Sequence, residues 1–433
     1  MSSDAPVTPE NDPDHSRNFV LLIVYQCWLR IGWIFKTESI IMPAVLDVIG
    51  GSAWLRGCLP MLNRLGQSVP PLLASDRIRN TRQKQKVLAC STAVMGGAFF
   101  TLALVWYVTG GKASWYLPLI FLIVYAIFFT ATGINMLVFN TLTGKLVKAN
   151  QRGQLSLYGT VIGASLAALC AYWLLNLWLS SDRATANESR FDLVFAFTGA
   201  MFTSAAGLTF AFRERSDTFN ESRRSGFQLV TASAKSVLAD RNFLLLAIIA
   251  GLFGMSLTLF PHYQRLGRDR FELSMTALIP WVIAQNLGAA AFSVPSGWIA
   301  DRLGTRIVLR WMLLTMCVAP ILAIVLAQYQ LAGWGWFTLV FCLLGLTPVT
   351  MRFFNYYTLE ITGRENHPQY LSTMSIAMAV PPVLLSIPMG ALVEIISFEF
   401  VFILVTICIF IGWILTFFLI EPRHVDGTKG KTV

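Results

Sequence analysis

The chain has 433 residues, of which 55% are hydrophobic and only 13% are charged, and its mean hydropathy is +0.61. These values exclude an ordinary soluble protein, because a surface in contact with water needs far more charge. The net charge of +10 does not indicate nucleic-acid binding, because the bases lie in short stretches between long apolar runs. The sequence carries no hydrolase or nucleotide-binding motif and no metal-ligand spacing, so we expect no enzyme, no cofactor and no metal site.

Twelve apolar runs of membrane-spanning length follow a polar, acidic segment, 1–18, which we expect to be a disordered cytoplasmic tail. A polar linker at 213–241 divides the runs into two groups of six, and an amphipathic helix is one interpretation of its residues 227–239. The predicted spans of the first group lie at 19–44, 52–74, 87–110, 115–140, 154–179 and 191–212. Those of the second group lie at 242–262, 273–300, 307–328, 334–357, 370–393 and 398–420, before a polar tail at 421–433.

Two internal matches indicate that the groups are duplicated halves. Ser-Val-Pro followed by Asp-Arg occurs at 68–77 and again at 293–302, about 225 residues further on. Phe-Asn occurs near the end of the fourth predicted span of each half, at 139–140 and 354–355, which are 215 residues apart. In both copies of the first match we expect the apolar segment to end at the Pro. The Lys and Arg that follow it then lie on the side of the membrane where basic residues are in excess. Duplicated halves are a common plan of secondary transporters.

The second copy, Gly297-x-x-Ala300-Asp301-Arg302-x-Gly304-x-Arg306, resembles the signature loop of the major facilitator superfamily. The resemblance covers about residues 19–420. It implies an all-α membrane protein with twelve transmembrane helices in two six-helix bundles, 19–212 and 242–420. It also implies that the signature loops latch the cytoplasmic helix ends during gating, with Gly297 allowing close helix packing and Arg302 and Arg306 pairing with acids or carbonyls. The gating residues implied are Asp76, Arg77, Arg79, Gly297, Asp301, Arg302, Gly304 and Arg306.

The distribution of bases predicts the orientation. Alternate loops and the C-terminal tail hold about 21 Lys and Arg, whereas the remaining loops hold about six. This excess places both termini in the cytoplasm, and we expect a monomeric protein of the inner or plasma membrane in contact with the lipid bilayer.

The first predicted span carries a polar stripe. Its residues follow one another at i, i+4, i+7 and i+11, and they are Gln26, Arg30, Trp33 and Thr37. Arg30 lies about 16 Å from the start of the span, close to the midplane at which transporters bind their substrates. A fixed cation there attracts an anionic group. The alternative is a structural pair of Arg30 with Glu38 or with a backbone carbonyl.

Other polar residues lie in the second, fourth, eighth and tenth spans, and we expect part of them to bind substrate. They are Asn63, Gln67, Asn135, Gln285, Asn286, Arg352, Asn355 and Tyr356. The resemblance implies that the first, fourth, seventh and tenth spans line a central cavity. Amides in a helix bundle often bond neighbouring helices instead, so a structural role stays open. Glu38 is the candidate proton carrier, or a paired structural carboxylate. We expect Lys36 to reach toward the membrane surface and His262, at the end of the seventh span, to be solvated.

These features predict a secondary active transporter that moves a small anionic organic solute by alternating access, with H⁺, Na⁺ or no ion coupled to it. An exporter of drugs or amphipathic compounds is one alternative. It is less favoured, because the fourth span lacks the Arg and the fifth lacks the Gly-Pro pair that such members of the family often carry. A transporter-like receptor or sensor without flux is the other alternative.

Overall fold

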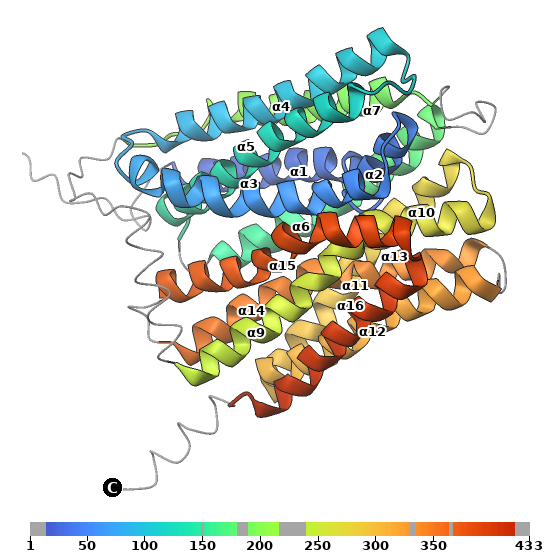
Figure 1. Cartoon of the computed structure of the whole chain (residues 1–433). Coiled ribbons are helices and arrows are strands. Elements are labelled where there is room, and N and C mark those ends of the chain that lie inside the picture. The colour runs from blue at the N-terminus through green and yellow to red at the C-terminus, as the bar shows by residue number, and fades with distance from the viewer. Residues whose placement is uncertain are drawn as a thin grey trace, which may run out of the picture. The chain divides into compact units, whose positions relative to one another are not determined.

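The computed structural model describes residues 14–148, 151–179, 189–215, 240–329, 334–362 and 367–420, and within these ranges it contains helices but no strand. The helices follow one another in the order that the apolar runs predict (Figure 1). The first seven are α1 (His15–Phe35), α2 (Ile41–Val48), α3 (Ala53–Arg79), α4 (Lys84–Thr109), α5 (Leu117–Leu146), α6 (Arg152–Trp178) and α7 (Phe191–Thr209). The others are α9 (Arg241–Gly254), α10 (Phe260–Phe271), α11 (Leu278–Leu303), α12 (Thr305–Tyr329), α13 (Thr338–Leu344), α14 (Leu346–Ile361), α15 (His367–Ile395) and α16 (Phe398–Leu415).

Eleven helical segments in the described ranges have the length and hydropathy to cross a membrane. The predicted span that is missing from this set corresponds to α3, which has 27 residues but is less apolar because it contains Arg56, Asn63, Arg64 and Gln67. With α3 as the second span, the chain is an all-α, multi-pass membrane protein with the twelve-helix fold that the sequence predicts.

The first predicted span is divided in two. Helix α1 ends at Phe35, residues 36–40 form a turn, and the short helix α2 begins at Ile41. The expected continuous helix over 19–44 is therefore interrupted. Its apolar composition gave no sign of the break, because Ile40, Ile41 and Met42 continue the hydrophobic run.

The segments expected to be tails fall largely outside the described residues. This holds for 1–13 and for 421–433, and the predicted helix at 227–239 also lies outside the described ranges. Helix α1 begins at His15, so the last residues of the predicted N-terminal tail belong to the first span.

The helices continue past the prolines near their C-terminal ends, in agreement with the predicted spans 52–74 and 273–300. Helix α11 passes through Pro295 and ends at Leu303, and α3 passes through Pro70 and Pro71. Proline removes one backbone hydrogen bond and bends a helix without always ending it. The seventh span likewise extends to Phe271, because a turn of 3₁₀ helix joins α9 to α10.

The chain forms two compact units. Unit 1 contains residues 1–37 and 65–226, and unit 2 contains residues 38–64 and 227–433. In unit 1, α4 packs along α7 and α1 packs against α6 (Figure 1). A buried apolar cluster that includes Leu22, Tyr25 and Val138 joins α1 to α5.

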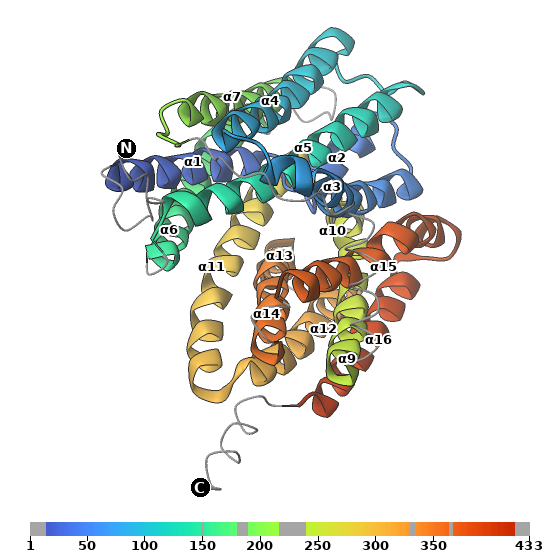
Figure 2. The same ribbon diagram turned by 90° about the vertical axis from the view of Figure 1, so that its left-hand side faces the viewer.

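In unit 2, α15 packs on α9, α11 on α13 and α12 on α16 (Figure 2). Trp281 is fully buried, and its ring stacks on that of Phe341 with their centroids 4.7 Å apart. Asp240 caps the start of α9, because its Oδ1 accepts hydrogen bonds from the backbone N–H groups of Asn242 and Phe243 at 3.0 and 3.1 Å.

Each unit contains a crossing at which two glycines let the second and fourth spans of its half meet backbone to backbone. In unit 1, a Cβ on Gly133 of α5 would lie 2.1 Å from the carbonyl oxygen of Gly66 in α3. In unit 2, a Cβ on Gly288 of α11 would lie 2.1 Å from the carbonyl oxygen of Cys342, and one on Gly345 would lie 2.4 Å from backbone atoms of α11. Such matching crossings are expected for duplicated halves.

Candidate functional site

Arg30 lies on the side of α1 that faces α6 within unit 1. Its Nη2 donates a hydrogen bond to Oγ1 of Thr160 at 3.0 Å, and the side chain is half-buried. A hydroxyl carries no charge of its own, so this bond orients the guanidinium. Arg30 therefore brings a cation into the membrane-spanning part of unit 1, where such residues usually serve function.

Two glycines of α6 make room for this polar stripe. A Cβ on Gly163 would lie 2.9 Å from Cδ of Arg30, and a Cβ on Gly159 would lie 2.3 Å from Oε1 of Gln26. Small residues four apart let membrane helices approach closely. The spacing of Gly159 and Gly163 was therefore the sequence signal that α6 receives the side chains of Gln26 and Arg30.

The Lys36 side chain is surrounded by aromatic rings of unit 1. Its Nζ is 4.0 Å from the ring centroid of Trp33, 4.2 Å from that of Phe129 and 5.1 Å from that of Phe128, and the residue is only 2% exposed. The prediction that Lys36 reaches toward the membrane surface is therefore wrong. Aromatic faces attract the ammonium group and make its burial tolerable.

The last residue of the predicted stripe, Thr37, lies beyond the end of α1. Its hydroxyl donates to the carbonyl oxygen of Ile34 at 2.6 Å, which helps to end the helix. Thr37 therefore does not continue the helical face of Gln26, Arg30 and Trp33.

Asn135 is buried among helices of unit 1. Its Nδ2 donates to the hydroxyl oxygens of Tyr25 at 2.8 Å and of Thr92 at 2.7 Å, and Tyr25 and Thr92 are themselves 2.8 Å apart. The network ties α1, α4 and α5 together, which is the structural alternative for a membrane amide. Gln67 is half-buried in the same unit.

Unit 2 brings together Glu38, Asn63 and Arg64. The Asn63 amide donates a hydrogen bond to the Glu38 carboxylate, and Glu38 interacts electrostatically with Arg64. Arg64 Nη2 also contacts Sδ of Met351 on α14 at 3.6 Å. An acid and a base thus share one polar cluster between the turn after α1 and the middle of α3.

The remaining candidates of unit 2 lie on α11 and α14. Gln285 accepts a hydrogen bond from Ser39 at 2.5 Å, whereas Nδ2 of Asn286 donates to the carbonyl oxygen of Val282 in its own helix. Arg352 and Tyr356 are exposed, and Asn355 is half-buried. The structure thus links Gln285 to the turn that holds Glu38.

The signature loop of unit 2 is a one-residue connection. Gly304 separates α11 from α12 and has φ 97° and ψ 154°, a conformation that is available almost only to glycine. Next to it, Arg306 Nη1 donates to the carbonyl oxygen of Leu419 at 2.8 Å. Thr305 donates to Glu360 at the end of α14, so the loop is tied to two other helix ends.

The other signature residues differ in their surroundings. The guanidinium of Arg302 lies 4.2 Å from the ring centroid of Trp298, and Arg77 is exposed. A Cβ on Gly297 would meet no atom within 4 Å, so the expected close packing at this glycine is wrong. The side chains of Asp76, Arg79 and Asp301 lie outside the described part of the structure.

A buried ion pair, which the sequence did not indicate, lies at one end of unit 2. Asp47 of α2 pairs with Arg56 of α3, and their side chains are 3% and 7% exposed. Asp47 also accepts a hydrogen bond from Nε2 of Gln264 at 2.9 Å and lies 3.8 Å from Nη1 of Arg265. The sequence alone does not reveal this pair, because it does not show that α10 covers Asp47.

A cavity of about 410 Å³ adjoins this ion pair. Glu394 of α15 lines it and accepts a hydrogen bond from the backbone N–H of Ala53, the first residue of α3. A carboxylate at a helix N-terminus is stabilised by the helix dipole. Glu394 therefore fastens α3 to α15.

His262 of α10 is also buried at this end of unit 2. It is fully shielded from solvent, and neither ring nitrogen has a hydrogen-bond partner among the described residues. The prediction of a solvated histidine is wrong, because the helix continues past it to Phe271.

The comparisons with known proteins agree with this arrangement. The family model described as "Major Facilitator Superfamily" matches residues 269–432. A search of curated protein sequences gave no match.

Solved transporters share the fold over most of the chain. A mutant of the nucleoside transporter NupG is 12% identical and has a TM-score of 0.73, covering 93% of this chain and 100% of its own. A POT family transporter in complex with 5-aminolevulinic acid is 12% identical with a TM-score of 0.70, covering 93% and 96%. A variant of the E. coli fucose:proton symporter FucP is 14% identical with a TM-score of 0.58, covering 94% and 100%. At such low identity, these similarities concern the fold.

Proposed function

We propose that this chain, a member of the major facilitator superfamily and a transporter embedded in the membrane, moves a small anionic organic solute by alternating access. The observation that carries the proposal is Arg30, a guanidinium oriented by a hydroxyl in a membrane-spanning helix of unit 1. Placing a charge in the membrane costs at least about 2.5–3.5 kcal/mol, so a residue of this kind needs a compensating role. A planar guanidinium binds carboxylate or phosphate with two parallel hydrogen bonds.

The charges of unit 2 support the same substrate class. Arg64 and Arg352 lie on membrane-spanning helices there, and Glu38 is the acid that interacts with Arg64. The negative charge of Glu38 offsets the positive charge of only one of these two arginines. The candidate residues of both units therefore carry more positive than negative charge, which favours an anion over a cation as the solute.

We expect Arg30→Ala to reduce uptake of the anion into proteoliposomes about 10- to 100-fold, because a hydrogen bond to a charged group contributes about 1.5–3 kcal/mol. A thermal-shift screen of carboxylates, organic phosphates and their neutral analogues first identifies the solute. A ligand at 100 times its Kd stabilises the folded protein by about 2.7 kcal/mol. Lys112→Ala, in an exposed loop, is the control and should transport normally. Undiminished transport of every anionic solute by the Arg30→Ala variant contradicts the proposal.

We further propose that Glu38 carries a coupling proton. Its hydrogen bond from Asn63 and its electrostatic interaction with Arg64 support this role, because protonation of the carboxylate would weaken both and so link the proton to the conformation of the turn. Glu38→Gln should abolish accumulation driven by a pH gradient while preserving exchange of labelled for unlabelled solute. Glu399→Gln, which removes a carboxylate from an exposed ion pair, is the matched control. Full proton-driven accumulation by the Glu38→Gln variant would rule out this role.

A further inference from the structure

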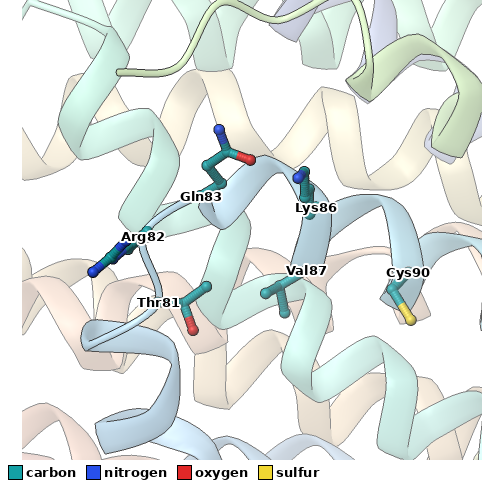
Figure 3. A pocket seen from close by; sticks show the side chains of 6 residues that line it. All are labelled: Thr81, Arg82, Gln83, Lys86, Val87 and Cys90. Atoms are coloured by element: carbon teal, nitrogen blue, oxygen red, sulfur yellow. The ribbon is translucent and has the colours of Figure 1, made fainter. Parts of the chain in front are cut away.

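A basic pocket lies at the turn between α3 and α4 in unit 1. It has a volume of about 620 Å³, and Figure 3 shows the residues that line it, which are Thr81, Arg82, Gln83, Lys86, Val87 and Cys90. Arg82 and Lys86 are exposed, so their charges are accessible to a ligand. The amide of Gln83 and the ammonium of Lys86 point to the same side of the turn, whereas the guanidinium of Arg82 points away from them. The pocket therefore offers two cations and an amide donor beside apolar surface.

The surroundings strengthen the positive character of the pocket. The stretch 75–86 contains five Lys and Arg but one acid. The acid that caps α4 comes from elsewhere in unit 1: Glu214 accepts a hydrogen bond from the backbone N–H of Gln85 at 2.7 Å. Nζ of Lys145 forms an ion pair with Oε1 of Glu214 at 2.8 Å and so offsets its charge. Glu214 thus satisfies the backbone N–H of Gln85 at the start of α4 without the help of Arg82 or Lys86.

An exposed apolar stripe runs along α4 from the pocket. Cys90 lines the pocket, and the stripe continues with Val94, Phe100, Leu104 and Tyr107, which are 40%, 42%, 63% and 75% exposed. Their spacing places them on one face of the helix. From Cys90 to Tyr107 the helix rises about 25 Å, which is longer than one leaflet of a bilayer is thick. The stripe is therefore a lipid-facing surface that begins at the basic pocket.

We propose that this pocket binds an anionic phospholipid. Its phosphate lies at Lys86 and the amide of Gln83, which supply hydrogen bonds, while Arg82 adds positive charge to the headgroup site. An acyl chain runs past Val87 along the exposed face of α4. Basic pockets between membrane helices bind anionic headgroups on the cytoplasmic side of a membrane. The distribution of bases predicts that this end of α4 lies on that side. The combination of paired cations and an adjoining apolar stripe selects a lipid over a soluble anion.

Native mass spectrometry of the full-length protein in detergent tests the proposal, with dioleoyl phosphatidylglycerol and dioleoyl phosphatidylcholine as probes. The test variant is Arg82→Gln with Lys86→Gln. The control is Lys112→Gln with Lys148→Gln, which removes the same charge from positions outside the pocket. We expect the test variant to bind phosphatidylglycerol at least tenfold more weakly than the wild type and the control, with phosphatidylcholine binding equal in all three.

Equal phosphatidylglycerol binding by the test variant and the control overturns the proposal, and so does phosphatidylcholine binding as tightly as phosphatidylglycerol. Inorganic phosphate and dihexanoyl phosphatidylglycerol distinguish the headgroup from the whole lipid. If either displaces the long-chain lipid at an equal concentration, the acyl stripe contributes nothing and the lipid assignment is wrong. Should the double variant fail to fold, Lys86→Gln alone, compared with Lys148→Gln, is expected to show a smaller loss in the same direction.

Discussion

Replacing Arg56 by Leu is expected to lower the free energy of unfolding by about 3–5 kcal/mol, because it leaves the buried Asp47 carboxylate without its closest cation. Gln264 and Arg265 remain near Asp47, but the first is neutral and the second is 3.8 Å away and 37% exposed. Arg56→Lys should lose less, because the charge is kept while the planar geometry is not. Chemical or thermal unfolding in a fixed detergent measures the difference.

The double variant Asp47→Asn with Arg56→Leu separates the loss of a pair from the loss of packing. We expect it to be more stable than Arg56→Leu alone, because no uncompensated charge is left buried. Arg265→Gln is the control, and it should change stability by less than about 1 kcal/mol, because its closest partner is Asp269 in an exposed pair. If Arg56→Leu and Arg265→Gln prove equally mild, the buried pair does not stabilise unit 2.

Gly288→Val is expected to destabilise the folded protein at least as much as Arg56→Leu does. A single Cβ at this position would lie 2.1 Å from the carbonyl oxygen of Cys342, and backbone atoms have less freedom to move aside than flexible side chains. Inserting even small groups into a packed core costs about 1–3 kcal/mol, and valine adds two further carbons. The expected result is loss of most monodisperse protein in size-exclusion chromatography after extraction, because α11 can no longer pack against α13.

Gly97→Val provides the matched control. Gly97 also lies in the middle of a membrane helix, but a Cβ there would meet no atom within 4 Å, so folding should be unaffected. The duplication gives a second test: Gly133→Val should fail in the same way as Gly288→Val, since Gly133 meets the backbone of Gly66 in unit 1. Normal yields of the Gly288→Val variant would show that the two helices can separate at no cost.

The sequence predicted the number and order of the spans because the length of an apolar run reports directly on the membrane. It also located α3 as the apolar run 52–74, although the polar residues of α3 hold its hydropathy below that of the other spans. It did not predict the turn at 36–40, because hydrophobicity measures burial in lipid and carries no information on helix breaks.

The candidate site was predictable in part. The spacing of Gln26 and Arg30 predicted a shared helix face, and the structure places both against glycines of α6. The Asp47–Arg56 pair and the burial of His262 were not predictable, because they depend on which distant helices pack against them. Roles in transport remain predictions for all the candidate residues, and the experiments above address them.

Because residues 38–64 belong to unit 2, the order of biosynthesis separates them from the rest of that unit. These residues leave the ribosome before the whole stretch 65–226 has been made, and their packing partners follow only after it. At about 5–20 residues per second, the segment waits on the order of ten seconds in the membrane without those partners. The N-terminal half made alone would never receive them, so we expect the protein to mature as one cooperative product and not as two successive domains.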